Sequence, residues 1–284
     1  MQSSFSIAVN SSNTVDGTSN SVYRYNFPSG GVQFTKGCKI ALQSLNMYYS
    51  TPNITTANSN NSFSYIWQGV TTTVNIPSGY YQISDLNSYL QSIMIANNHY
   101  LIDTNGDYVY FLEMTTNATL YAIQLNAYPI PTAAQAGVLG YTAPGGWGGY
   151  PAAAETPQFV IPATNIQNIF GINAGTYPAV VQATTYSKTS DFTPQVSPLQ
   201  SIFVLCSLVN NKYGVPNTVL FNFSPTVSYG SIISILPPSL VYSDIQVGNY
   251  TSIDISFVDQ DFNRLNILDN KISLLLAIAP PADG

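Results

Sequence analysis

The chain has 284 residues, of which 45% are hydrophobic and only 7% are charged, and its formal net charge is −6. This apolar content excludes a disordered chain, and the length is sufficient for a large buried core. The seven Lys and Arg residues are scattered along the sequence, whereas a protein that binds phosphate backbones needs clustered cations. We therefore expect no direct binding of nucleic acid.

Membrane and secretory features are also missing from the sequence. The first residues have neither a basic region nor a long apolar run, so they do not resemble a signal peptide. The longest strongly apolar stretch, residues 272–279, is too short to cross a bilayer. No membrane partner is expected, and Cys38 and Cys206 are expected to be reduced and unpaired.

Short runs of β-branched and aromatic residues, bounded by Gly, Pro, Asn and Ser, predict strands along the whole chain. In residues 252–258 the apolar side chains alternate, whereas the nearly continuous apolar run 202–208 favours a strand buried on both faces. The predicted strands are residues 5–9, 22–27, 39–49, 63–67, 71–76, 108–114, 119–125, 202–208, 219–223, 252–258 and 272–278.

Two segments have the apolar spacing of helices, residues 84–94 and 164–170. Ser84 is a candidate N-cap of the first helix, and Gly171 is placed to end the second. Because helices and strands do not alternate, the sequence predicts an all-β sandwich with one or two short helices in its connections.

Residues 99–112 contain Asn105-Gly106 between two apolar runs, which predicts a hairpin. The alternative is a calcium loop, because Asp103, Asn105 and Asp107 occur at every second position. Such a loop needs Gly at its sixth position and Glu at its twelfth, where this chain has Tyr and Met. We therefore favour a plain turn.

From residue 127 to 162 the composition changes to Ala, Gly and Pro, which predicts a long loop or a small insertion without regular strands or helices. Tyr141, Trp147 and Tyr150 lie within it and are candidates for an exposed recognition loop. The alternative is that Trp147 folds back and caps the sandwich. The sequence does not distinguish between the two.

The sequence contains no catalytic signature, cofactor motif or metal site. His99 is the only histidine, and its polar neighbours predict a surface residue. The one carboxylate cluster, near the C-terminus, consists of Asp254, Asp259, Asp261 and Asp269. Asp259 and Asp261 follow the strand 252–258 and are better explained as turn residues, because Asp side chains bond their own backbone.

Three stretches of the sequence, residues 75–90, 169–178 and 237–278, carry a family resemblance. The last has a Pro-rich and aromatic lead-in, an alternating strand, an Asp-rich turn and a closing apolar strand. In this pattern the chain resembles the minor capsid (penton) proteins of virophages and Polinton-like viruses.

That resemblance implies one single jelly-roll domain over residues 1–284, with a possible insertion at about 127–162. It also implies a homopentamer at each fivefold vertex of an icosahedral virion, in contact with a double-jelly-roll major capsid protein and assembled in the host cytoplasm.

The composition agrees with such a role, because protein interfaces are depleted in Lys, Glu and Asp and enriched in Tyr, and this chain has 21 Tyr. The same composition would suit a carbohydrate-binding lectin or fibre sandwich, which is the alternative function. A cupin-type enzyme would need more histidines than one.

Overall fold

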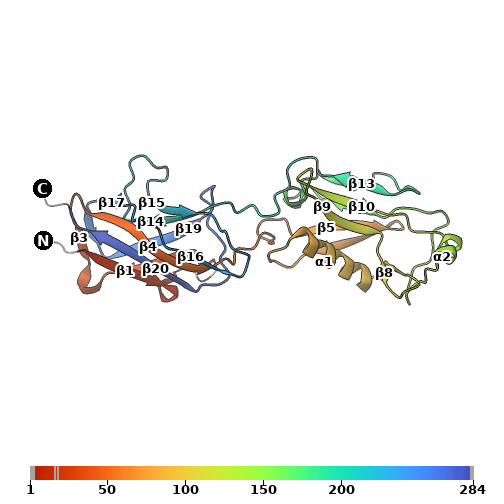
Figure 1. Cartoon of the computed structure of the whole chain (residues 1–284), viewed down its shortest axis with the longest axis horizontal. Helices are drawn as coiled ribbons and strands as arrows, with labels where there is room; N and C mark the ends of the chain where they lie inside the picture. The colour runs from red at the N-terminus through yellow and green to blue at the C-terminus, as the bar shows by residue number, and fades with distance from the viewer. Residues whose placement is uncertain (1–3, 16, 18, 282–284) are drawn as a thin grey trace. The chain divides into compact units, whose positions relative to one another are not determined.

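In the computed structural model, which describes residues 4–15, 17 and 19–281, the chain forms two compact units (Figure 1). Unit 1 contains the described residues up to Pro52 and from Leu199 onward, and unit 2 contains residues 53–198. The sequence predicted a single domain with an insertion at about 127–162. The inserted unit is much larger than predicted. The prediction rested on composition, and only the Gly- and Pro-rich part of this unit differs in composition from the rest of the chain.

Unit 1 is built from two principal antiparallel sheets and a short ribbon. The first sheet has the order β1-β20-β4-β16, with β17 also paired to β4, and the second has the order β15-β14-β19-β2. The first sheet comprises β1 (Phe5–Asn10), β20 (Ile272–Ala279), β4 (Lys39–Tyr48), β16 (Ile232–Ile235) and β17 (Ser243–Asp244). The second comprises β15 (Val219–Phe223), β14 (Ile202–Cys206), β19 (Ser252–Val258) and β2 (Val22–Asn26). The ribbon pairs β18 (Gly248–Tyr250) with β3 (Val32–Phe34).

The strand order of unit 1 is that of a jelly roll. The chain passes from β1 in the first sheet to β2 in the second, returns to β4, and then crosses again to β14. After β15 it alternates once more through β16, β19 and β20, so that the first and last strands pair with each other. Eight strands in two sheets with this connectivity form two Greek keys. The predicted all-β fold is confirmed.

The core of unit 1 follows from the alternation of its strands. In β19 the buried positions are Ile253, Ile255, Phe257 and Val258, so the predicted one-sided strand is confirmed. The prediction that residues 202–208 are buried on both faces is wrong, because Phe203 and Leu205 in β14 are only half-buried. Their apolar side chains are partly covered by loop residues, as in the contact of Phe203 with the Phe262 ring at 5.2 Å.

Unit 2 contains two larger sheets, a two-stranded hairpin and all three α-helices of the described chain. The first sheet has the order β12 (Gly175–Tyr177), β11 (Gln158–Ile161), β5 (Ser62–Trp67) and β6 (Val70–Asn75). The second has the order β13 (Tyr186–Thr189), β10 (Ala122–Ala127) and β9 (Leu112–Asn117). The hairpin joins β7 (Leu101–Ile102) to β8 (Tyr108–Val109).

Helix α1 (Ile83–Ala96) packs inside unit 2 and buries Leu86, Leu90 and Met94. It contacts β9, where the Asn87 side chain accepts a hydrogen bond from the Met114 amide at 2.8 Å. The helix begins at Ile83, one residue before the predicted cap, Ser84. Its N-cap is Gln82, whose backbone amide donates a hydrogen bond to the Asp85 carboxylate. The predicted helices therefore lie in one connection of the jelly roll, between β4 and β14.

The other two helices are short. Helix α3 (Ile166–Phe170) ends at Gly171, which adopts the left-handed conformation, as predicted. Helix α2 (Ala133–Leu139) lies in the segment that was expected to lack regular structure, and that expectation is wrong. Thr132 caps its first turn through a reciprocal bond with Gln135, and this local chemistry outweighs the surrounding Gly and Pro.

Candidate functional site

The three residues of the predicted recognition loop, Tyr141, Trp147 and Tyr150, are half-buried and pack against the core of unit 2. The Trp147 ring meets the Trp67 ring edge-on, with centroids 5.5 Å apart, and Tyr150 lies 5.7 Å from Trp147. Trp147 therefore folds back onto the protein, which is the second of the two interpretations left open. Its ring covers the core of unit 2, however, and not the jelly roll.

His99 belongs to the same aromatic cluster, so the prediction of a polar surface residue is wrong. Its ring stacks on Trp67 with centroids 4.8 Å apart, and Nδ1 lies 2.8 Å from the Tyr65 hydroxyl, a hydrogen-bond distance. This partial burial lowers the pKa of His99 from 6.5 to about 4, so its ring is neutral at pH 7. The polar neighbour Asn97 instead donates a side-chain hydrogen bond back to the Ile93 carbonyl at 2.7 Å.

Asp259 and Asp261 lie in a turn after β19, as predicted. The Asp259 carboxylate accepts hydrogen bonds from the amides of Asp261 and Asn263, at 2.8 and 2.9 Å. Asp254 instead forms a two-bond ion pair with Arg24 on the neighbouring strand, at 2.7 and 2.9 Å. The described residues contain no group of three or more His, Cys, Asp or Glu that could hold a metal ion.

The predicted hairpin is present as β7 and β8, in which Leu101 faces Val109 and Ile102 faces Tyr108. Its turn is plain, as expected, because the Asp103 carboxylate accepts from the amides of Asn105 and Asp107. These bonds lower the pKa of Asp103, so its carboxylate is charged at pH 7.

One face of this hairpin is an aromatic surface that the sequence reasoning missed. Tyr108 of β8 is 49% exposed, and its ring lies beside those of the buried Tyr100 and the half-buried Tyr110. The alternation of Tyr and Val at positions 108–110 places the two tyrosines on one side of the strand, but the sequence analysis used this pattern only to predict a strand.

Both cysteines are buried in unit 1, where no disulfide joins Cys38 to Cys206. Burial raises the pKa of the Cys206 thiol to about 12, which leaves it protonated and unreactive at pH 7.

Unit 1 has an apolar edge, the segment from β16 to β18, which exposes large hydrophobic side chains along one border of the first sheet. Leu236 is 77% exposed and Val241 69% exposed, and Pro237 and Pro238 interrupt the pairing of this border with β4. No charged residue occurs between Lys212 and Asp244. The exposed hydrophobic residues of the apolar edge are Ile232, Leu236, Leu240, Val241, Tyr242 and Val247.

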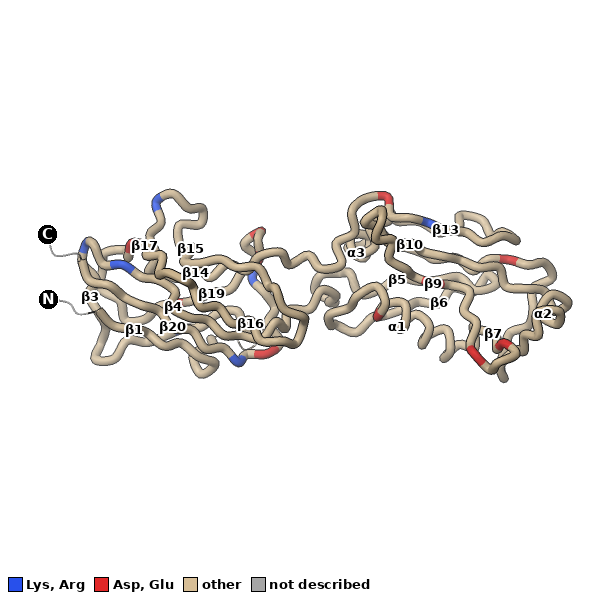
Figure 2. The backbone as a smooth tube through the Cα atoms, in the orientation of Figure 1, with Lys and Arg blue, Asp and Glu red and all other residues tan. Residues whose placement is uncertain are grey.

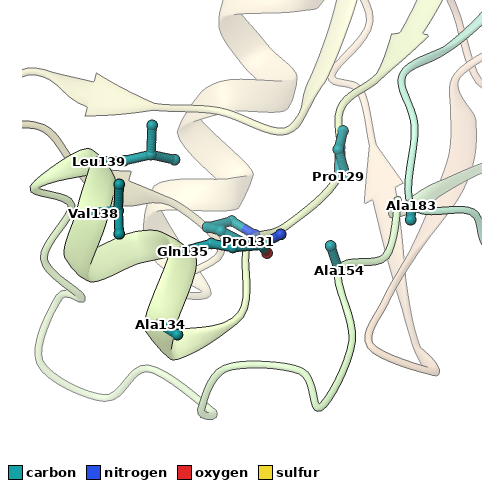
Figure 3. A pocket seen from close by; sticks show the side chains of 8 residues that line it. All are labelled: Pro129, Pro131, Ala134, Gln135, Val138, Leu139, Ala154 and Ala183. Carbon is teal, nitrogen blue, oxygen red and sulfur yellow. The ribbon is translucent and has the colours of Figure 1, made fainter.

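Unit 2 carries an open apolar groove of about 480 Å³ beside α2 (Figure 3). Val138 and Leu139 of the helix line it together with prolines and alanines, and Gln135 is its one polar side chain. The Gln135 side-chain oxygen already accepts from the Thr132 amide, so it serves the helix cap. Nothing in the groove fixes the orientation of a ligand.

Charge is distributed unevenly between the two units (Figure 2). Unit 2 has six acidic residues and one basic residue, Lys188, whereas the other six basic residues belong to unit 1. No helix in the described part of the chain is both long and apolar enough to span a membrane.

No family model matches the chain, and no curated protein matches it in sequence. Among solved structures, the chain is similar to the mavirus penton protein, with 11% identity over 98% of this chain and 100% of that one, and a TM-score of 0.43. It is also similar to a chain in the cryo-electron microscopy structure of the Sputnik virophage, with 12% identity, coverage of 99% and 98%, and a TM-score of 0.39. The sequence resemblance to minor capsid (penton) proteins named the same kind of protein as the first of these structures.

Proposed function

We propose that this chain is a structural virion protein, a penton subunit that forms pentamers at the fivefold vertices of an icosahedral capsid and contacts a major capsid protein there. It has no catalytic role in this proposal. The observation that carries it is the apolar edge of the jelly-roll unit, which an isolated protein would leave facing water.

An uncharged row of exposed hydrophobic residues is typical of a protein interface. A ring of subunits needs a heterologous contact, in which one border of each copy meets a different border of the next. Pro237 and Pro238 separate β16 from β17, so pairing of the apolar edge with a neighbouring strand would be limited to these short pieces. Contacts there would therefore be made by side chains, which suits a closed ring better than an open fibril.

The alternative function, a carbohydrate-binding lectin or fibre, rests on the composition of the chain. The half-buried Trp147 ring packs against Trp67, which leaves less of it to contact a sugar. A glycan array with the purified chain tests it directly. Reproducible binding that Trp147→Ala abolishes would favour the lectin.

The proposal is tested by native mass spectrometry of the purified chain, alone and with the major capsid protein, and by locating the chain in purified particles. We expect density for it at the fivefold vertices. Leu236→Asp and Val241→Asp should abolish incorporation into particles, whereas Val70→Asp, which charges an equally exposed position in unit 2, should not. Absence of the chain from particles would refute the proposal.

A further inference from the structure

The tyrosine face, defined as Tyr100, Tyr108 and Tyr110, is the side of the β7–β8 hairpin opposite Leu101. Tyr108 is its exposed member, since Tyr100 is only 8% exposed and Tyr110 is half-buried. The inward side is fixed by Leu101, which is fully buried in the core of unit 2. Because side chains alternate across a strand, the residues next to Leu101 and Val109 project to the other side. The ring of Tyr108 lies 4.5 Å from that of Tyr100 and 6.5 Å from that of Tyr110, centroid to centroid.

The surroundings of this face are acidic. Asp103 and Asp107 lie in the turn of the same hairpin, and the charged Asp103 is held by two backbone amides. Asp107 directly precedes Tyr108 and is exposed. His99, which precedes Tyr100, is neutral at pH 7. Figure 2 shows the two acidic positions close together near β7, with the one basic residue of unit 2 on β13.

Unit 2 already contains one cation held between a tyrosine and a carboxylate. The Lys188 ammonium group lies 5.3 Å from the centre of the Tyr177 ring and is paired with the Asp191 carboxylate. Lys188 is the only basic residue in unit 2, so this unit supplies no second cation for the tyrosine face. The hairpin likewise has an aromatic ring, Tyr108, close in sequence to carboxylates, those of Asp103 and Asp107.

We propose that the tyrosine face, with Asp103 and Asp107, is a docking site for a basic segment of a partner protein, and that an Arg or Lys side chain of that segment lies against the Tyr108 ring. A cation over an aromatic face is attracted by the ring, and carboxylates nearby add to that attraction. The charge of unit 2 repels nucleic acid and anionic lipid. This inference is independent of the proposed capsid role, since it concerns unit 2 alone.

The test is fluorescence anisotropy of the full-length chain with a labelled peptide containing three Arg residues in a Gly-Ser background. A peptide with Gln in place of each Arg is the reference. We expect the Arg peptide to bind and the Gln peptide not to bind. We also expect binding to weaken as ionic strength rises, because the carboxylates are exposed.

Variants separate a local site from the general charge of unit 2. Tyr108→Ala should weaken binding about two- to fivefold, the range for an exposed cation–aromatic contact, and Tyr108→Phe should retain it. Asp107→Asn should weaken it as well. Two controls should bind like the parent: Tyr121→Ala removes a 74% exposed tyrosine elsewhere in unit 2, and Glu155→Gln removes an acidic charge elsewhere.

Several results would overturn the proposal. The first two are an absence of binding by the parent chain and equal binding of the Gln peptide. The third is an equal loss of binding in the control variants, which would indicate attraction by net charge alone. Binding of an uncharged oligosaccharide that Tyr108→Ala abolishes, without binding of the Arg peptide, would replace it with a sugar site. Intrinsic tryptophan emission of each variant verifies that unit 2 is folded.

Discussion

Acidification should destabilise unit 2 through His99. In the folded chain its ring is stacked on Trp67 and bonded to Tyr65, and its pKa is about 4, whereas in the unfolded chain it titrates near 6.5. Burial raises the pKa of Tyr65 to about 12, so its hydroxyl stays protonated throughout this range. As the pH falls, the unfolded chain takes up the proton first. The stability that depends on neutral His99 is therefore complete above pH 6.5 and is lost as the pH falls towards 4.

The size of this effect follows from the two pKa values. The full difference between the two pKa values of His99 corresponds to a loss of about 3.4 kcal/mol in the free energy of unfolding, which is reached only below pH 4. At pH 5 the linkage relation gives a loss of about 2 kcal/mol. The ring is only half-buried, so solvent screens the effect, and about 1 kcal/mol is the loss that we expect at pH 5.

The chain offers a clean assay, because its only two tryptophans, Trp67 and Trp147, both lie in unit 2. Urea unfolding followed by tryptophan emission therefore reports on unit 2. Measured at pH 7 and pH 5, the free energy of unfolding should fall by about 1 kcal/mol more in the parent chain than in His99→Gln. Carboxylates titrate equally in both proteins and cancel in the comparison. An identical pH dependence in the two chains would refute the reasoning.

Three further predictions concern unit 1. Leu45→Ala, at a fully buried position in β4, should lower the free energy of unfolding of unit 1 by about 2–5 kcal/mol, seen by calorimetry, while leaving the tryptophan-detected transition unchanged. Cys38 and Cys206 should react slowly with a thiol reagent in the native chain and yield two free thiols after denaturation without reductant; finding none would indicate a disulfide. Association through the apolar edge should change little between low and high salt in light-scattering measurements, and a strong salt dependence would show that charged groups form the contact.

The sequence predicted the strands of the jelly roll well, because each has its own local signal. Alternation in residues 252–258 and the apolar run 272–278 both mark strands within one residue of their observed bounds. The short pieces β16 and β17 escaped notice because Pro237 and Pro238 separate them, and only their pairing with β4 makes them strands. The size of the insertion also escaped notice, since unit 2 uses the same kinds of strand as unit 1.

The interaction surfaces were predicted less well, because exposure is a tertiary property. Trp147 stands among glycines and looked exposed, yet Trp67, eighty positions earlier, covers one of its faces. His99 stands among asparagines and looked solvated, yet the same Trp67 stacks on it. Conversely, Tyr108 looked like an ordinary strand residue, and only its 49% exposure, opposite the buried Leu101, shows that its ring is outward.

Unit 2 is inserted into the sequence of the jelly roll, between β4 and β14, and this insertion bears on how the chain folds. Strand β4 belongs to the first sheet and β14 to the second, and residues 53–198 separate the two in the sequence. Closing a flexible loop of that length costs about 4 kcal/mol in chain entropy. In folded unit 2, however, the buried Asn53 side chain donates a hydrogen bond to the Val196 carbonyl at 2.6 Å, which ties the two ends of the insertion together. An insertion that folds first would thus present the jelly roll with a short, closed connection, and would speed a topology that is otherwise slow to form.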